Sequence, residues 1–294
     1  MKLLKKNKPS ENFDRHYSLV KEKKFNNLLK LMFETSIFIL VGILISKIFS
    51  YLYKIIIARY LGANIFGLYS LSLVTILLFA AISGFGISEG VLRYISLYRG
   101  KNEKNKIRYI FRLSSKLLLF STIIIALISF LLSDFISLVI FKNQALAIWL
   151  KIFSFLIPLW VFSIFFMNIM IAFERIKQQT IIEKIIQSSA KFFFLVFFIF
   201  LGLKTNAVIF SFFLGIFIFF LSTFIYCKYK LSNVFIEYHL KKSKRIQILT
   251  NLISYSVPIM FFGIISNIFY WTDSLVIGFF KTTIDVGIYN AAIP

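Results

Sequence analysis

The chain is poor in the residues that build reactive centres and covalent cross-links. Its 294 residues include one cysteine, Cys227, and two histidines, His16 and His239. A single cysteine excludes an intrachain disulfide and a cysteine-based metal site. The two histidines lie far apart in polar segments, so they form no catalytic or metal cluster. We therefore expect no metal, no cofactor and no catalytic residue.

Sequence motifs for nucleotide and hydrolytic chemistry are missing as well. The chain has no G-x-x-x-x-G-K-[ST] phosphate loop and no H-E-x-x-H zinc motif. Gly84, Gly86 and Gly90 in GFGISEG lack the dinucleotide-binding spacing, and we expect them to allow close helix packing or a bend. Residues 1–30 are charged throughout, so no cleavable signal peptide is visible.

Acidic residues are scarce beside basic ones. Asp and Glu number 12 against 34 Lys and Arg, which gives a net charge of +22. In a soluble protein this excess would suggest nucleic acid, but no recognition motif accompanies it. The basic residues stand between apolar runs, where they act as topology signals and as contacts for anionic lipids. Anionic membrane lipids are thus expected partners, and nucleic acid is not.

Long apolar runs dominate the chain. It is 59% hydrophobic, with a mean hydropathy of +0.83, values that place it in a bilayer. Because a spanning helix needs about 20 mostly apolar residues, the sequence predicts an all-α polytopic membrane protein. The predicted spans are 31–53, 66–90, 114–133, 146–173, 181–201, 206–226 and 249–273, with an eighth beginning near Gly287.

The basic residues alternate between the two ends of these spans. One set of connections carries 25 Lys and Arg, the other carries 5, and 4 lie inside spans. Because cytoplasmic segments are enriched in Lys and Arg, we expect the N-terminus to lie in the cytoplasm and the chain to be a multi-pass protein of the cytoplasmic membrane.

One stretch of the chain occurs twice. Ser46–Ser72 aligns without a gap on Ser266–Ala292, a shift of 220 positions that keeps Gly67/Gly287 and Tyr69/Tyr289 identical. The second copy begins six spans after the first begins, so both insert the same way up, as in transporters built from parallel repeats. We expect a basic tail (1–30), a six-helix lobe (31–226), a basic linker (227–248) and the start of a truncated second lobe (249–294).

Charged residues inside the spans are the best candidates for a site, because each is costly to bury in lipid. Lys47, Ser50, Tyr51 and Lys54 share one helical face, and Lys184, Gln187, Ser188 and Lys191 repeat that spacing. Two cationic stripes suit a water-filled cavity that accepts an anion. Alternatively, Lys54, Arg59 and Lys184 extend their charges to the lipid head groups.

Three further residues within spans have two or more interpretations each. Asp273, in the second copy, suits a counter-charge for Lys54, a proton site or an interfacial cap. Pro158 and Pro258 each free a backbone carbonyl inside a span, which happens in helices that line a cavity and also in harmless kinks.

The segment RYLGANIFGLY, residues 59–69, resembles the R-x-L-G-x-x-x-F-G-x-Y signature of polysaccharide-biosynthesis flippases. The matching residues are Arg59, Gly62, Phe66, Gly67 and Tyr69, and Phe85, Gly86 and the basic segment 93–112 follow at the expected distance. These flippases share a superfamily with multidrug exporters and lipid II flippases. Their members have two lobes and more spans than this chain.

The resemblance implies a flippase for a polyprenyl-diphosphate-linked oligosaccharide, not an enzyme. The diphosphate would meet Lys47, Lys54, Arg59 and Lys191, Asp273 would serve as coupling group or counter-charge, and glycan-assembly proteins would be partners. One alternative is a cation-coupled drug exporter, whose sites favour carboxylates. Another is a membrane glycan polymerase or ligase, although the connections at 54–65, 134–145 and 202–205 are short for an external catalytic loop.

Overall fold

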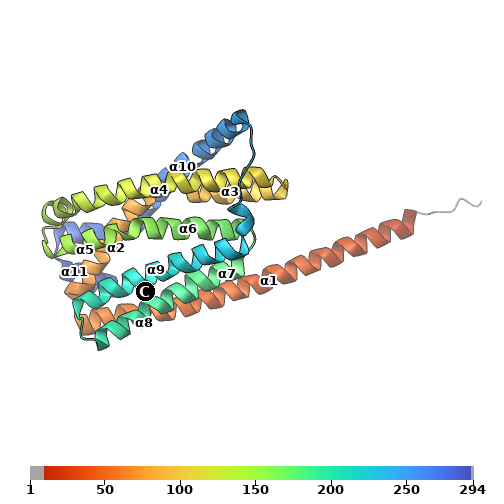
Figure 1. The fold of residues 1–294 in the computed structure, drawn as a ribbon. Coiled ribbons are helices and arrows are strands. Elements are labelled where there is room, and N and C mark those ends of the chain that lie inside the picture. Colours follow the sequence, from red (N-terminus) through yellow and green to blue (C-terminus); the bar gives the residue numbers. More distant parts are fainter. Residues whose placement is uncertain (1–9, 293–294) are drawn as a thin grey trace, which may run out of the picture.

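The computed structural model describes residues 10–292, and every regular element in that range is helical (Figure 1). Five helices there are long and apolar enough to cross a membrane, and the bent pair α5–α6 makes a sixth. The protein is thus the all-α polytopic membrane protein that its apolar runs predict. The α-helices are α1 (Ser10–Ile56), α2 (Ala63–Gly84), α3 (Ile87–Gly100), α4 (Lys104–Phe135), α5 (Ala145–Ser154), α6 (Leu156–Ala172), α7 (Ile176–Thr180), α8 (Gln187–Phe200), α9 (Thr205–Lys230), α10 (Lys242–Phe280) and α11 (Thr283–Ala292).

A single residue joins the first two spans, in place of the connector predicted at 54–65. The first span continues beyond α1 through a π-helical turn, Ile57–Leu61, and only Gly62 separates this turn from α2. Gly62 has φ +96°, a conformation that glycine adopts at no steric cost. The connector prediction is wrong because nothing before Gly62 breaks the helix, so Lys54 and Arg59 are helical residues.

The span predicted at 66–90 is broken into two helices. Phe85 and Gly86 both have positive φ and separate α2 from α3. A Cβ at Gly86 would overlap the carbonyl oxygen of Ser256 on α10, and a Cβ at Gly90 would lie 2.6 Å from the Oγ of that serine. The glycines of GFGISEG therefore supply both features expected of them, a bend and a close approach between helices.

The span predicted at 146–173 is bent by 42° between α5 and α6. Pro158 lies in the first turn of α6 and has no N–H to donate to the carbonyl of Ser154, which explains the break at Phe155. Pro258, by contrast, lies inside α10, and the helix continues through it.

The span predicted at 181–201 belongs to an unbroken helical run. α7 passes through a π-helical turn, Ile181–Ile186, into α8. This run is not among the helices that are apolar enough to be recognised as spans by composition. It carries three charged residues in its central part, Glu183, Lys184 and Lys191.

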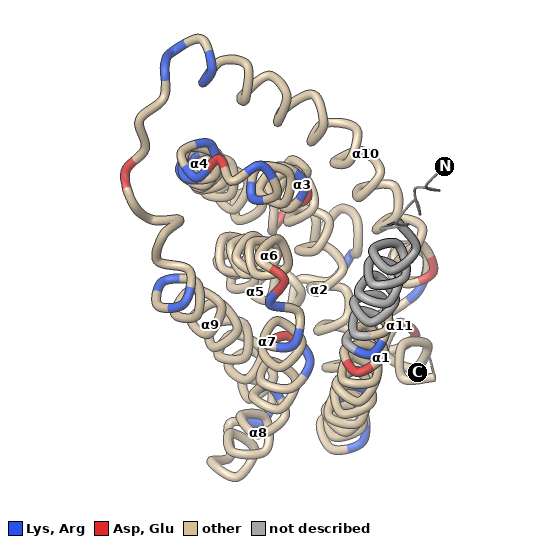
Figure 2. Tube along the Cα trace, turned by 90° about the vertical axis from the view of Figure 1, so that its right-hand side faces the viewer, with Lys and Arg blue, Asp and Glu red and all other residues tan. Residues whose placement is uncertain are grey.

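Basic residues gather at one end of the bundle, which faces the viewer in Figure 2. Several of them hold the linker 231–241 in place: Arg108 donates to the carbonyl of Asn233 (3.0 Å), and Arg245 donates to that of Leu240 (2.9 Å). The linker is shorter than the predicted segment 227–248 because α9 and α10 extend into it. Part of the basic charge thus has a structural role that the charge pattern alone did not reveal.

The two copies of the repeat touch where α2 packs on α11. A Cβ at Gly67 would overlap the carbonyl oxygen of Thr283, and a Cβ at Gly287 would overlap that of Ala63. Positions 63 and 67 correspond to 283 and 287 after a shift of 220, so the two contacts exchange under the repeat. The α2–α11 contact is therefore approximately twofold. The eighth helix begins at Thr283, slightly earlier than predicted.

We expect Gly67→Ala to destabilise the α2–α11 contact, because the added methyl group meets backbone and cannot be relieved by a side-chain rotation. Overpacking of this kind costs about 1–3 kcal/mol. The measurement is the midpoint of thermal unfolding of the purified protein in detergent.

Gly263→Ala is the matched control. Gly263 also lies inside a helix, but a Cβ there has no heavy atom within 4 Å, and alanine is the better helix former. Its midpoint should stay level or rise. Equal midpoints for the two variants would contradict the close contact at Gly67.

Candidate functional site

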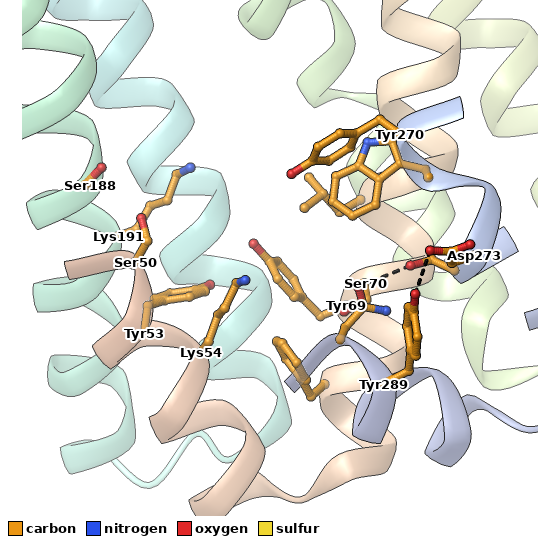
Figure 3. Close-up of a pocket in the computed structure, with 15 residues that line it drawn as sticks. Ser50, Tyr53, Lys54, Tyr69, Ser70, Ser188, Lys191, Tyr270, Asp273 and Tyr289 are labelled. Atoms are coloured by element: carbon orange, nitrogen blue, oxygen red, sulfur yellow. Dashed lines mark hydrogen bonds between the residues drawn. The ribbon is translucent and has the colours of Figure 1, made fainter. Parts of the chain in front are cut away.

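A cavity of about 360 Å³ lies between α1, α2, α8, α10 and α11 (Figure 3). Its wall is made of hydroxyl, aromatic and charged side chains from both copies of the repeat. The lining residues are Ser50, Tyr53, Lys54, Phe66, Tyr69, Ser70, Leu73, Ser188, Lys191, Tyr270, Trp271, Asp273, Ser274, Tyr289 and Asn290.

The cavity lining follows the internal repeat. It contains both members of five pairs of positions that differ by 220: Ser50 and Tyr270, Tyr53 and Asp273, Lys54 and Ser274, Tyr69 and Tyr289, Ser70 and Asn290. The cavity therefore lies at the junction of the two copies, which is where transporters built from parallel repeats hold their substrates.

Equivalent positions also make equivalent contacts. In the first copy the rings of Tyr53 and Tyr69 pack edge to face with centroids 5.9 Å apart. In the second copy the hydroxyl of Tyr289 donates to a carboxylate oxygen of Asp273 at 2.6 Å. The same pair of positions meets in both copies, but the second copy has replaced an aromatic contact with a charge-assisted hydrogen bond.

The structure brings three of the predicted site residues together. Lys54 from α1, Lys191 from α8 and Asp273 from α10 all line the cavity. In Figure 3, Lys191 and Ser188 lie across the cavity from Asp273 and Tyr289. α10 continues seven residues past Asp273 to Phe280, so this carboxylate does not cap the helix.

Lys47 and Arg59, the other two candidate anion ligands, are exposed and are not part of the lining. The face of α1 that meets the cavity carries Ser50, Tyr53 and Lys54. Near its start, Ser46 shares a hydrogen bond with Ser188 on α8 (2.8 Å). The predicted face and the observed face share Ser50 and Lys54, but Tyr53 lines the cavity in place of Lys47 and Tyr51, so the face is rotated by less than the roughly 100° of one residue.

Lys191 has a site built around it. A Cβ on Gly215 of α9 would overlap the Lys191 side chain at Cγ, so this glycine makes room for the stem of the lysine. Its ammonium nitrogen lies 5.0 Å from the ring centroid of Phe212 and 5.9 Å from that of Trp160. Aromatic faces attract a cation, and among the described residues Lys191 forms no ion pair.

The residues of the R-x-L-G-x-x-x-F-G-x-Y motif shape the cavity. Gly62 makes the tight junction, Gly67 allows α11 to approach, and Phe66 and Tyr69 form part of the wall. The Tyr69 ring also contacts the ring of Phe212 on α9, with centroids 5.4 Å apart. This contact connects the cavity wall to α9, the helix against which the Lys191 side chain packs. Arg59 is the motif residue outside this set.

Sequence reasoning missed several polar residues in the lining, chiefly Tyr53, Tyr289 and Asn290. A signal for them was present. The cavity-facing positions 50, 53 and 54 of the first copy, shifted by 220, give 270, 273 and 274. Shifting the polar positions of the first copy by 220 would therefore have identified the wall residues that the second copy contributes.

Comparison with known proteins identifies the kind of protein that holds this cavity. A family model described as "Polysaccharide biosynthesis protein" matches residues 33–294, most of the chain. The chain belongs to this family. It is accordingly a multi-pass membrane protein related to polysaccharide biosynthesis, in agreement with the resemblance carried by residues 59–69.

A solved structure described as "protein A" is also similar. The identity is 14%, the TM-score is 0.60, and the match covers 89% of this chain and 59% of that one. At this identity the similarity concerns the fold alone. The chain spans less than two thirds of the length of that structure. No curated protein matches the chain.

We expect a cysteine at position 50 to react with a charged, water-soluble thiol reagent, because it would line a polar cavity and a thiol ionises only where water reaches it. The background should carry Cys227→Ser, which removes the buried native cysteine. The measurement is the fraction of Ser50→Cys protein labelled in membranes.

Ile48→Cys serves as the comparison. Ile48 lies on the same helix with an exposed fraction of 59%, but it is not part of the cavity lining, so we expect it to face an apolar environment. It should remain unlabelled under the same conditions. Equal labelling at positions 48 and 50 would show that the cavity-facing side of α1 has been misassigned.

Proposed function

We propose that the protein moves a polyprenyl-diphosphate-linked oligosaccharide from the cytoplasmic to the outer face of the cytoplasmic membrane. The observation that supports this most strongly is the convergence of Lys54 and Lys191 on one cavity at the junction of the repeats. Membership of the polysaccharide biosynthesis family supports it independently. The protein acts as a flippase and makes or breaks no covalent bond.

The two lysines would hold the diphosphate. A diphosphate is the most strongly charged part of a lipid-linked sugar, and moving it through hydrocarbon without partners is prohibitive. Two ammonium groups in the cavity would compensate for lost hydration with charge-assisted hydrogen bonds. The hydroxyls of Ser50, Tyr69 and Ser188 supply further donors around the same space.

Asp273 would act as the counter-charge or coupling group. In the absence of substrate its carboxylate offsets the lysine charge, and its bond to Tyr289 fixes its position at 2.6 Å. An arriving diphosphate would compete with this carboxylate for the lysines. Protonation or a cation would then neutralise Asp273, which gives a means of coupling transport to an ion gradient.

A second body would complete the transporter. The charge split of 25 to 5 supports a cytoplasmic N-terminus and a cytoplasmic linker 231–241. Alternating access needs two lobes that move about the site between them. We propose that the face of α10 and α11 continues into a second lobe, or meets another copy, around the same cavity.

A cation exporter is the second candidate, because a carboxylate in the cavity wall is what a cationic drug requires. Asp273 is the observation that favours it. The two lysines of the same wall oppose it, since they would repel a cation. Glycan-assembly proteins are expected partners only of the flippase.

The test is transport of an undecaprenyl-diphosphate-linked saccharide by the protein in proteoliposomes. Lys54→Ala and Lys191→Ala should each lower the transport rate about tenfold or more, because a hydrogen bond to a charged group contributes about 1.5–3 kcal/mol. Asp273→Asn should change the dependence of the rate on an imposed ion gradient.

Lys184→Ala provides the control. Lys184 lies on the same helical run as Lys191, but it pairs with Glu183 and does not line the cavity, so its loss should leave transport unchanged. Transport of a cationic dye that needs Asp273 and neither lysine would favour the exporter and contradict the flippase.

A further inference from the structure

A second, larger cavity of about 980 Å³ adjoins the first and lies between α2, α3, α6 and α10. The two cavities share part of their walls, because Tyr270 and Trp271 line both. Trp160 lines the second cavity, and its ring lies 5.9 Å from the ammonium of Lys191, which lines the first. The two cavities are thus neighbours, with Lys191 and these aromatic residues lying where they meet.

Aromatic rings form a large part of the second wall. Two of the three tryptophans of the chain, Trp160 and Trp271, are in it, together with Tyr255, Phe262 and Tyr270. The Tyr270 and Trp271 rings meet edge to face with centroids 4.8 Å apart, so each is oriented by the other. Figure 3 shows Tyr270 on the side of the first cavity opposite Lys191.

Polar groups occur among these rings. Ser88, Glu89, Arg93 and Asn267 line the same cavity. The guanidinium carbon of Arg93 lies 4.2 Å from the ring centroid of Tyr255, a cation–π contact that positions the arginine at the wall. The cavity therefore combines flat apolar surfaces with groups that donate and accept hydrogen bonds, a pattern typical of sites for small polar molecules.

Saccharides fit this combination. A sugar ring has a face of C–H groups, which packs on the negative face of an aromatic ring, and an edge of hydroxyls that need hydrogen-bond partners. We propose that the second cavity holds the saccharide of the lipid-linked substrate, with Trp271 and Trp160 as stacking surfaces for the sugar next to the diphosphate. This inference rests on the proposed function and adds the place where the sugar is bound.

The geometry favours a sugar over the lipid tail as the occupant. A polyprenyl chain would fit the aromatic rings but offers no hydrogen bond to the charged groups of Glu89 and Arg93 or to the side-chain oxygen of Asn267, and covering such groups without hydrogen bonds is costly. The cavity also begins beside Lys191, where the first sugar must follow if the diphosphate lies between Lys54 and Lys191. In this arrangement the first cavity holds the charged diphosphate of the substrate, and the second cavity holds its glycan.

Binding of two probes that differ only in the sugar tests this division. The probes are radiolabelled undecaprenyl diphosphate and undecaprenyl-diphosphate-N-acetylglucosamine, measured with the protein in nanodiscs. Trp271→Leu and Trp160→Leu should each weaken binding of the sugar-bearing lipid by up to about tenfold, the scale expected for loss of one stacked ring. Binding of the sugar-free lipid should fall by a clearly smaller factor, because Trp271 also borders the first cavity and Trp160 contacts Lys191, and the binding that remains shows that the variants are folded.

Two further variants separate the alternatives. Trp271→Tyr retains an aromatic face and should recover most of the affinity for the sugar-bearing lipid. Lys191→Met should weaken binding of both lipids, because it acts on the diphosphate.

Equal loss for both lipids in the leucine variants would assign the cavity to the polyprenyl chain and overturn the proposal, and so would leucine variants with unchanged binding. If neither lipid binds the unaltered protein, the proposed function itself fails. That outcome is distinct from a failure confined to the aromatic cavity.

Discussion

The close approach of α2 and α11 at Gly67 and Gly287 is the constraint on which the rest of the structure depends. No side chain fits between these two helices at that point, since a Cβ at either glycine would overlap backbone of the other helix. Hydrogen bonds among Asn64, Thr283 and Asn143 reinforce the contact at its edge. Because the contact is symmetric under the repeat, it places equivalent residues of the two copies on opposite sides of one space, and that space is the first cavity.

The two copies place equivalent positions around this cavity, but the side chains at some of those positions differ in charge. The first copy contributes Lys54 where the second has Ser274, and the second contributes Asp273 where the first has Tyr53. A cavity built from identical halves would carry like charges that repel. Divergence between the copies has instead produced a wall with cations on one side and a carboxylate on the other, to which Lys191 is added from α8. Under the proposed function, an anion entering between them would meet an arrangement that is already oriented.

Much of this was predictable from the sequence, and the exceptions have physical reasons. The shift of 220 and the apolar runs indicated the repeat and the all-α membrane fold, and the cost of charges in spans singled out Lys54, Lys191 and Asp273. The cavity-facing side of α1 was predicted only in part, with Lys47 and Tyr51 in place of Tyr53, because it depends on how α1 packs on α8, which local spacing does not encode. The aromatic cavity was not foreseen, because Trp160 and Tyr255 are indistinguishable from core residues until α10 is seen to line one cavity with α3 and α6.

The central claim, that the two copies meet at the glycine contact, is tested most directly by a disulfide between Asn64→Cys and Thr283→Cys in a Cys227→Ser background. The side-chain oxygens of Asn64 and Thr283 are 2.6 Å apart. A protease site placed in the linker 231–241 allows the chain to be cut between the two cysteines, so that the disulfide is detected as a link between the two pieces. After cleavage the two pieces should remain joined until a reductant is added. With a control pair, Asn64→Cys and Gly263→Cys, the two pieces should separate after cleavage. Position 263 lies on α10 about 25 Å before Phe280, the end of the helix that adjoins Thr283. Separation of the first pair, or equal cross-linking of both pairs, would contradict the account.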